Sequence, residues 1–381
     1  MTYTVPSSLV SGPANQVISL VGIAAMAILM VQKMASKEKL QFQWPESYLM
    51  LGLIGAAGLS CFTALSSNVA VTATGDLAKI AIVYFLIINV ADSEKKVRIA
   101  IFAMIAGGLF PALLVLKTRI LDNVAGGVAN GRVDLTYGLV VLVPLTIQLA
   151  REVRPTFRPF LAVISALFAM AILASDSRAS VYGLLAALLI VGLRQSEFSA
   201  QLLTRSLFVG TVLFLGSHWT TEAGSTNLSS NPVVQAPIDS VRIAAGIFTS
   251  HPILGVGLGC SKLAWPANAQ ANSGFSNSIV SNNTLVQVLS EVGVLGFIPF
   301  ALLIGTAFIH SIRIFRTRVH GRSAGSTALG LEGSLVGFLV CGMFGSYLVS
   351  WSPYIVLGLV SALSLVLESQ QAQTSLRKME E

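Results

Sequence analysis

The sequence predicts an all-α, polytopic membrane protein with about 11 or 12 transmembrane helices, organised as one integral membrane domain over residues 1–381. The first observation is composition: 54% of the 381 residues are hydrophobic and only 11% are charged, whereas soluble chains have about 25% charged residues. The second is that apolar runs recur along the whole chain, many of them close to the about 20 residues that a spanning helix needs. These observations exclude a soluble protein and a protein with one membrane anchor.

Eleven segments are long enough, or nearly long enough, to cross a bilayer. In chain order they cover about 16–32, 48–65, 76–91, 98–116, 134–150, 159–175, 179–193, 205–217, 285–309, 329–349 and 352–367. The first lacks a basic stretch before it and an obvious cleavage site, so we expect a span there rather than a cleaved signal peptide. The run 205–217 is the shortest.

The distribution of basic residues predicts the orientation. The segments that connect consecutive spans lie on alternate sides of the membrane. The segments on one side, with the C-terminal tail, hold 17 of the 24 Lys and Arg residues, and the positive-inside rule places that side in the cytoplasm. The N-terminus then lies outside and the C-terminus inside. The long connection 218–284 becomes a large periplasmic loop, with a short helix expected at about 238–250. Because the net charge of +7 follows this alternation, it does not indicate nucleic acid as a partner.

Three of the outward basic residues are arginines near membrane boundaries, where burial in lipid costs about 2.5–3.5 kcal/mol. Arg132 lies in "NGRVDLTYG", Arg178 in "SDSRAS" and Arg242 in "DSVRIAAG". Arginine stays charged and presents a fixed fork of donors that suits phosphate, so the three could converge on one diphosphate. The alternative is local pairing with neighbouring acids: Arg132 with Asp134, Arg178 with Asp176, and Arg242 with Asp239.

A glycine-rich stretch, "HPILGVGLG", follows Arg242 and ends at Gly259. Gly255 and Gly257 fit a tight turn whose backbone amides could face an anion. His251 opens the stretch and is either a candidate base or an ordinary interfacial histidine. Lys262, just beyond it, is a further candidate for binding the substrate.

Three ordered segments carry a resemblance to a known family. They are "SDSRASVYGLLAALLI", "DSVRIAAGIFTSHPILGVGLG" and "SNNTLVQVLSEVGVLGFIPF". Together they resemble the O-antigen ligase/polymerase family of bacterial membrane glycosyltransferases over residues from about 130 to 310. The third fits the family's His-Asn, nine residues, Gly, two residues, Gly pattern, which ends here at Gly296. The resemblance implies a GT-C-like arrangement, usually with about twelve spans and both termini inside.

The chain departs from the family at the first position of this pattern, where Asn282 replaces the ligases' histidine and is followed by the expected Asn283. Asparagine can orient an acceptor hydroxyl but cannot take its proton. Candidates for a base are therefore His251, Asp239 and Glu291. An ionisable residue inside a membrane helix is a functional candidate, although Glu291 could equally have a structural role.

The resemblance implies a glycan donor on polyprenyl diphosphate and a site at the outer leaflet of a bacterial inner membrane. Arg178 and Arg242 would bind the diphosphate, Asn282 would position the acceptor, and Arg132 and Asn283 would bind substrate. Because diphosphate is already a good leaving group, neither a metal nor a cofactor is expected. The three cysteines, Cys61, Cys260 and Cys341, have no metal-binding spacing.

The acceptor and the reaction stay open at this point. The missing histidine favours an O-antigen or exopolysaccharide polymerase, which joins one lipid-linked glycan to another and can have a chain-length regulator as partner. The alternative is an O-antigen ligase, whose acceptor is a lipid A core. Two alternatives are not glycosyltransferases: a polytopic transporter, and a protein that binds lipid-linked glycan without catalysis. The sequence shows no duplicated halves, which many transporters have.

Overall fold

The computed structural model describes residues 41–120, 129–175, 177–195, 201, 204–212, 244–261, 263–264, 283–316 and 321–380. Throughout these ranges the regular secondary structure is helical, without any β-strand. Seven of the described helices are long and apolar enough to cross a membrane. The prediction of an all-α, multi-pass membrane protein is therefore confirmed. The total of 11 or 12 spans stays a prediction, because the expected span 16–32 lies outside the described residues.

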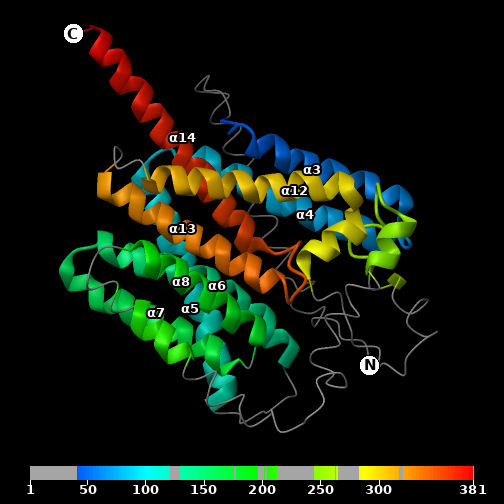
Figure 1. Cartoon of the computed structure of the whole chain (residues 1–381), viewed down its shortest axis with the longest axis horizontal. Helices are drawn as coiled ribbons and strands as arrows, with labels where there is room; N and C mark the ends of the chain where they lie inside the picture. Colours follow the sequence, from blue (N-terminus) through cyan, green and yellow to red (C-terminus); the bar gives the residue numbers. More distant parts are fainter. Residues whose placement is uncertain are drawn as a thin grey trace.

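Nine long helices are described, and a long connection separates α8 from α12 (Figure 1). They are α3 (Glu46–Ser60), α4 (Ser67–Val90), α5 (Glu94–Ile120), α6 (Ala129–Glu152), α7 (Arg158–Ala174), α8 (Arg178–Arg194), α12 (Thr284–Arg316), α13 (Gly321–Gly342) and α14 (Trp351–Glu380). Two 3-10 turns cover Cys61–Thr63 and Pro155–Phe157. Residues 204–212 and 244–250 are also helical; the first overlaps the segment predicted at 205–217, and the second falls within that predicted at 238–250.

Helix α13 lies at the centre of the bundle, where it packs against α6, α8, α12 and α14. Figure 1 shows it between α12 on one side and α6 and α8 on the other. Gly330, Gly333 and Gly337 recur on it at helical spacing, and a Cβ atom on each would come within 3.2 Å of a side chain of α6 or α8. Small residues thus let these helices approach closely, as is usual between helices in membranes.

Two predicted helix boundaries are wrong. Helix α4 begins at Ser67 rather than at 76, because its first turns pack on the 244–261 segment through Ala70, which is fully buried. Helix α13 ends at Gly342 rather than at 349. The chain turns there because the Thr284 hydroxyl donates to the carbonyl of Gly345 (2.7 Å) and accepts from the amide of Tyr347 (3.0 Å).

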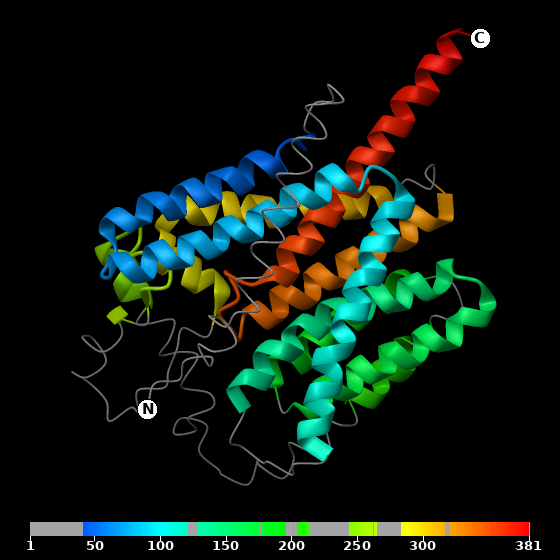
Figure 2. The ribbon, with the colours of Figure 1, turned by 180° about the vertical axis from the view of Figure 1, so that it is seen from behind.

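The two ends of the bundle differ in chemistry. At one end, Arg194 at the end of α8 pairs with Glu332 of α13 (2.6 Å), and Arg98 of α5 lies 3.4 Å from Glu152 at the end of α6. We call this the basic end, since most described residues of the predicted cytoplasmic set lie there. Helix α14 extends beyond the bundle at the same end (Figures 1 and 2).

Candidate functional site

The opposite end of the bundle gathers the starts of three helices around one turn of the chain. This turn, residues 341–347, follows the end of α13, and we call it the 341–347 turn. Cys341 Sγ contacts the carbonyl of Ala179 at the start of α8 (3.4 Å), and Thr284 at the start of α12 holds the turn as described above. The Tyr137 ring of α6 stacks on Tyr347, with centroids 3.9 Å apart and planes 3° apart. The N-terminal ends of α6, α8 and α12 therefore face the same end of the molecule.

A buried cluster of hydroxyl groups fixes the starts of α6 and α8 relative to each other. Thr136 Oγ1 lies 3.1 Å from Ser180 Oγ, and Ser180 Oγ lies 3.0 Å from Ser177 Oγ. Ser177 is the N-cap of α8, and its side chain accepts from the amide of Ser180. This is the usual role of serine before a helix, and it sets the place of Arg178 as the first residue of α8.

Arg178 is half-buried at this helix start. Its position is electrostatically unusual, because the N-terminus of a helix is its positive pole and favours anions over cations. Arg132 lies in the first turn of α6, which faces the same end, although its side chain is outside the described part of the structure. The backbone positions of Arg178 and Arg132 therefore lie at one end of the bundle, and their convergence on one diphosphate stays a prediction.

Helix α12 is interrupted at Gly293, whose φ of 66° and ψ of −167° are not helical. Four backbone groups lose their partners within the helix at this break, and the glycine-rich loop supplies new ones. The amides of Val256 and Gly257 donate to the carbonyls of Ser290 and Glu291, both at 3.0 Å. In return, the amides of Val294 and Leu295 donate to the carbonyls of Pro252 (2.9 Å) and Ile253 (3.2 Å). The loop thus bridges the two halves of α12.

The predicted tight turn is present, since Gly255, Gly257 and Gly259 all have positive φ. The predicted role of the amides of Gly255 and Gly257 in binding an anion is wrong. The amide of Gly255 donates to the carbonyl of His251 (3.0 Å), and that of Gly257 is used at the helix break. A Cβ on Gly255 would lie 2.4 Å from the carbonyl carbon of Glu291, so glycine is required here for close approach to α12.

The loop instead binds the carboxyl group of Glu291. Glu291 is 1% exposed. Its carboxyl oxygens accept from Ser261 Oγ (2.5 Å) and from Gln287 Nε2 (3.1 Å). With these donors engaged, the geometry favours the structural alternative for Glu291 over a role as the base.

Asn283 lies at the start of α12, where its side-chain Oδ1 accepts from the amides of Leu285 (2.9 Å) and Val286 (3.2 Å). This is helix capping, so only the NH₂ group of the side chain remains to contact a substrate. His251 is exposed at the beginning of the loop, with Nδ1 3.0 Å from Ser250 Oγ. It is therefore the accessible candidate base among the described residues.

Four predicted site residues lie outside the described residues: Arg242, Asp239, Asn282 and Lys262. Their roles remain predictions. Sequence reasoning missed Thr284, Tyr137 and Tyr347, which shape the 341–347 turn. A signal existed for Tyr137, since it lies in the same "NGRVDLTYG" stretch as Arg132. No local signal pointed to Tyr347, because it falls in an apolar run that was assigned to a helix.

Comparison with known proteins adds no further assignment to this site. No family model matches the sequence, and a search of curated proteins finds no match. The family resemblance therefore rests on the three segments quoted above.

Proposed function

We propose that this protein is a membrane glycosyltransferase that transfers glycan from a polyprenyl-diphosphate donor to an acceptor at the outer leaflet of a bacterial inner membrane. Within that class we propose an O-antigen or exopolysaccharide polymerase, acting without metal and with inversion at the anomeric carbon. The observation that carries the proposal is the convergence of three helix N-termini, one of which begins with Arg178, at the end opposite the basic end.

Electrostatics support an anionic ligand at this end. A helix N-terminus presents unpaired amides and a positive pole, which bind phosphate groups well. Arg178 adds a full positive charge where the pole of α8 already disfavours a cation. A diphosphate beside them would accept charge-assisted hydrogen bonds from the guanidinium group. The same contacts would strengthen as negative charge develops on the leaving diphosphate, which favours departure.

The remaining roles follow from the resemblance and from accessibility. Arg242 would be the second arginine on the diphosphate, and Asn282 would orient the acceptor hydroxyl for in-line attack. His251 is the favoured base because it is exposed, whereas the Glu291 carboxyl is bound within the protein. The acceptor is another lipid-linked glycan in a polymerase and a lipid A core in a ligase.

A transporter is the second candidate, and one observation favours it. Helix α12 is broken at Gly293, and interrupted helices form the substrate sites of many secondary transporters. In this chain, however, the backbone groups freed at the break bond to the 252–257 loop instead of facing a cavity. Because these backbone groups already have partners within the protein, the break in α12 is better explained as a structural joint than as a substrate site.

The test compares two charge-neutral arginine variants in the cell of origin. Arg178→Gln should abolish polymer while lipid-linked glycan units accumulate. The matched control is Arg154→Gln, which removes the same charge from an exposed position at the basic end and should leave the polymer unchanged. Losing one hydrogen-bonded contact to a charged group costs about 1.5–3 kcal/mol, or roughly a 10- to 150-fold loss. An unchanged glycan pattern in Arg178→Gln, together with loss of transport of another solute, would establish the transporter.

A further inference from the structure

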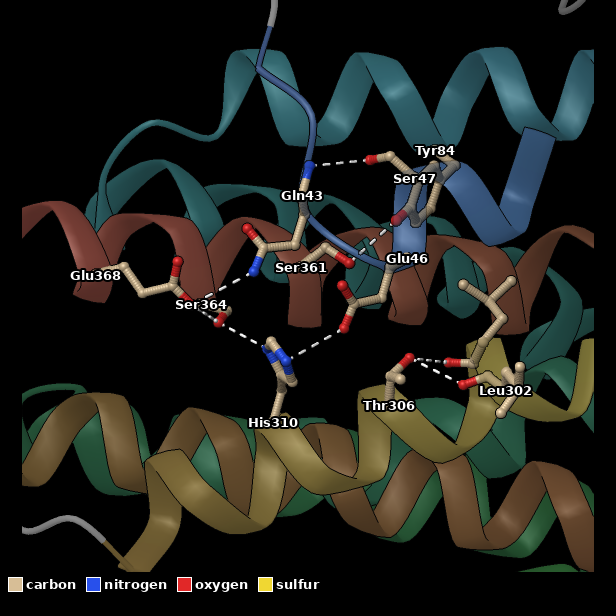
Figure 3. Close-up of polar contacts among 11 residues, drawn as sticks. Gln43, Glu46, Ser47, Tyr84, Leu302, Thr306, His310, Ser361, Ser364 and Glu368 are labelled. Atoms are coloured by element: carbon tan, nitrogen blue, oxygen red, sulfur yellow. Dashed lines mark hydrogen bonds and ion pairs between the residues drawn. The ribbon is translucent and has the colours of Figure 1, made fainter. Parts of the chain in front are cut away.

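The bundle contains a second cluster of ionisable groups, at the basic end, that the proposed transfer reaction does not use (Figure 3). Glu46 is the first residue of α3 and is 1% exposed. Its Oε1 lies 3.4 Å from Nε2 of His310, which is on α12, two turns before its end. The two side chains point toward each other between α3, α12 and α14.

A chain of hydrogen bonds leads from His310 to the protein surface. His310 Nδ1 lies 2.8 Å from Ser364 Oγ, and the Ser364 hydroxyl donates to Oε1 of Glu368 at 2.9 Å. Because the hydroxyl hydrogen goes to Glu368, the Ser364 oxygen must accept from His310, so Nδ1 carries a hydrogen. Glu368 is exposed, whereas Ser364 is buried. The chain therefore connects a buried pair to water.

Apart from the positive pole of α3, whose first residue it is, Glu46 has little else to stabilise a negative charge. Neither of its carboxyl oxygens accepts a hydrogen bond from another described residue. The nearby Thr306 hydroxyl donates instead to the carbonyls of Leu302 (2.9 Å) and Leu303 (3.1 Å). A buried carboxylate without donors is costly, and so is a buried imidazolium without a counter-ion. One proton placed between Oε1 and Nε2 relieves both costs.

Among the described residues, the other titratable groups that face Glu46 carry no positive charge. They are Tyr84 of α4, whose hydroxyl lies 3.1 Å from Ser361 Oγ, and Glu368 of α14. The described residues also contain no group of three or more His, Cys, Asp or Glu side chains that could hold a metal ion. A proton is therefore the ligand that the charges and the geometry favour.

We propose that Glu46 and His310 form a proton-binding site that exchanges with water through Ser364 and Glu368. For release, the proton on His310 Nδ1 moves to Ser364 Oγ while the Ser364 hydrogen moves to a Glu368 carboxylate. His310 is left neutral, with its Nε2–H donating to the Glu46 carboxylate, and the Glu368 carboxylic acid then gives its proton to water. One proton leaves, and no heavy-atom bond changes. The site sets the charge at the point where α3, α12 and α14 meet.

The proposal is tested by infrared difference spectroscopy on the full-length protein in lipid nanodiscs, from about pH 5 to about pH 8, where histidine changes charge. Wild type should give a carboxyl signal that titrates in this range, and Glu46→Gln should lose it. The matched control, Asp92→Asn, removes an exposed carboxylate paired with Lys96 and should keep the signal. A titrating signal that survives in Glu46→Gln, or the absence of any signal in wild type, would overturn the proposal.

A second variant tests the path. Ser364→Ala should leave the carboxyl signal in place but slow its response to a pH jump at least about tenfold, because the relay hydroxyl is gone. An unchanged response would refute the path. If Glu46→Gln does not fold, nitrogen NMR of the four histidines in the wild-type protein tests the proton-binding site instead. We expect one ring to keep hydrogen on Nε2 while its Nδ1 loses hydrogen as the pH rises, as the release path requires. Four rings that all titrate as free imidazoles would refute the site.

Discussion

Replacing Gly293 by alanine should destabilise the joint between α12 and the glycine-rich loop. The φ of 66° and ψ of −167° at Gly293 are essentially restricted to glycine, and holding another residue there costs about 1–3 kcal/mol. The added Cβ would also lie 2.2 Å from the carbonyl oxygen of Ile253, so the loop must move away. That movement breaks the bonds from the amides of Val294 and Leu295, and each backbone amide left unpaired away from water costs about 1–3 kcal/mol. The variant should therefore lose at least about 3 kcal/mol.

The assay is thermal unfolding of Gly293→Ala in the same detergent or nanodisc as wild type. The matched control is Gly305→Ala in the same helix, where an added Cβ meets nothing within 4 Å. Alanine there should be neutral or stabilising by about 0.5–1 kcal/mol, as expected in a helix interior. If Gly293→Ala unfolds at the wild-type temperature, the hydrogen bonds between the loop and α12 do not contribute to stability as the geometry requires.

Two further predictions concern packing and the loop. Gly183→Val should reduce the monodisperse fraction in size-exclusion chromatography, because a Cβ atom at this position would lie 2.8 Å from the backbone of α13. The control is Gly107→Ala, where an added Cβ meets nothing within 4 Å. If the two variants behave alike, α8 and α13 do not pack as closely as described. Burial raises the pKa of the Cys260 thiol, so less thiolate is present near neutral pH and alkylation should be slow and should accelerate as pH rises. In Gly293→Ala the loop moves and alkylation of Cys260 should become faster; an unchanged rate would show that the loop stays in place.

The parts of the fold that depend on local sequence were predictable. Lengths of apolar runs locate membrane helices because a spanning segment must satisfy its backbone within itself. This is why the runs at 98–116 and 159–175 correspond to α5 and α7. The end of α13 was not predictable in this way, since "MFGSYLVS" is as apolar as the helix before it. The turn there depends on the hydroxyl of Thr284, which is about 60 residues away in the sequence.

The site was predictable only in part, for a similar reason. The glycines at 255, 257 and 259 correctly indicate a tight turn, but the group that the turn binds is the Glu291 carboxyl of the same chain. The family pattern also included Gly293 without giving its role. The structure shows that Gly255 lies against the backbone of Ser290 and Glu291, and that Gly293 lies against the backbone of Ile253 and Leu254. Spacing in the sequence alone could not reveal either contact. The roles of Arg242 and Asn282 remain predictions from the resemblance.

The most direct test of the central claim is binding of undecaprenyl diphosphate to the purified protein in nanodiscs. The account predicts saturable binding by wild type, a roughly 10- to 150-fold weaker affinity for Arg178→Gln, and wild-type affinity for the exposed control Arg154→Gln. Equal affinities for all three proteins, or no binding by wild type, would contradict the proposal that the helix ends around the 341–347 turn hold a lipid diphosphate.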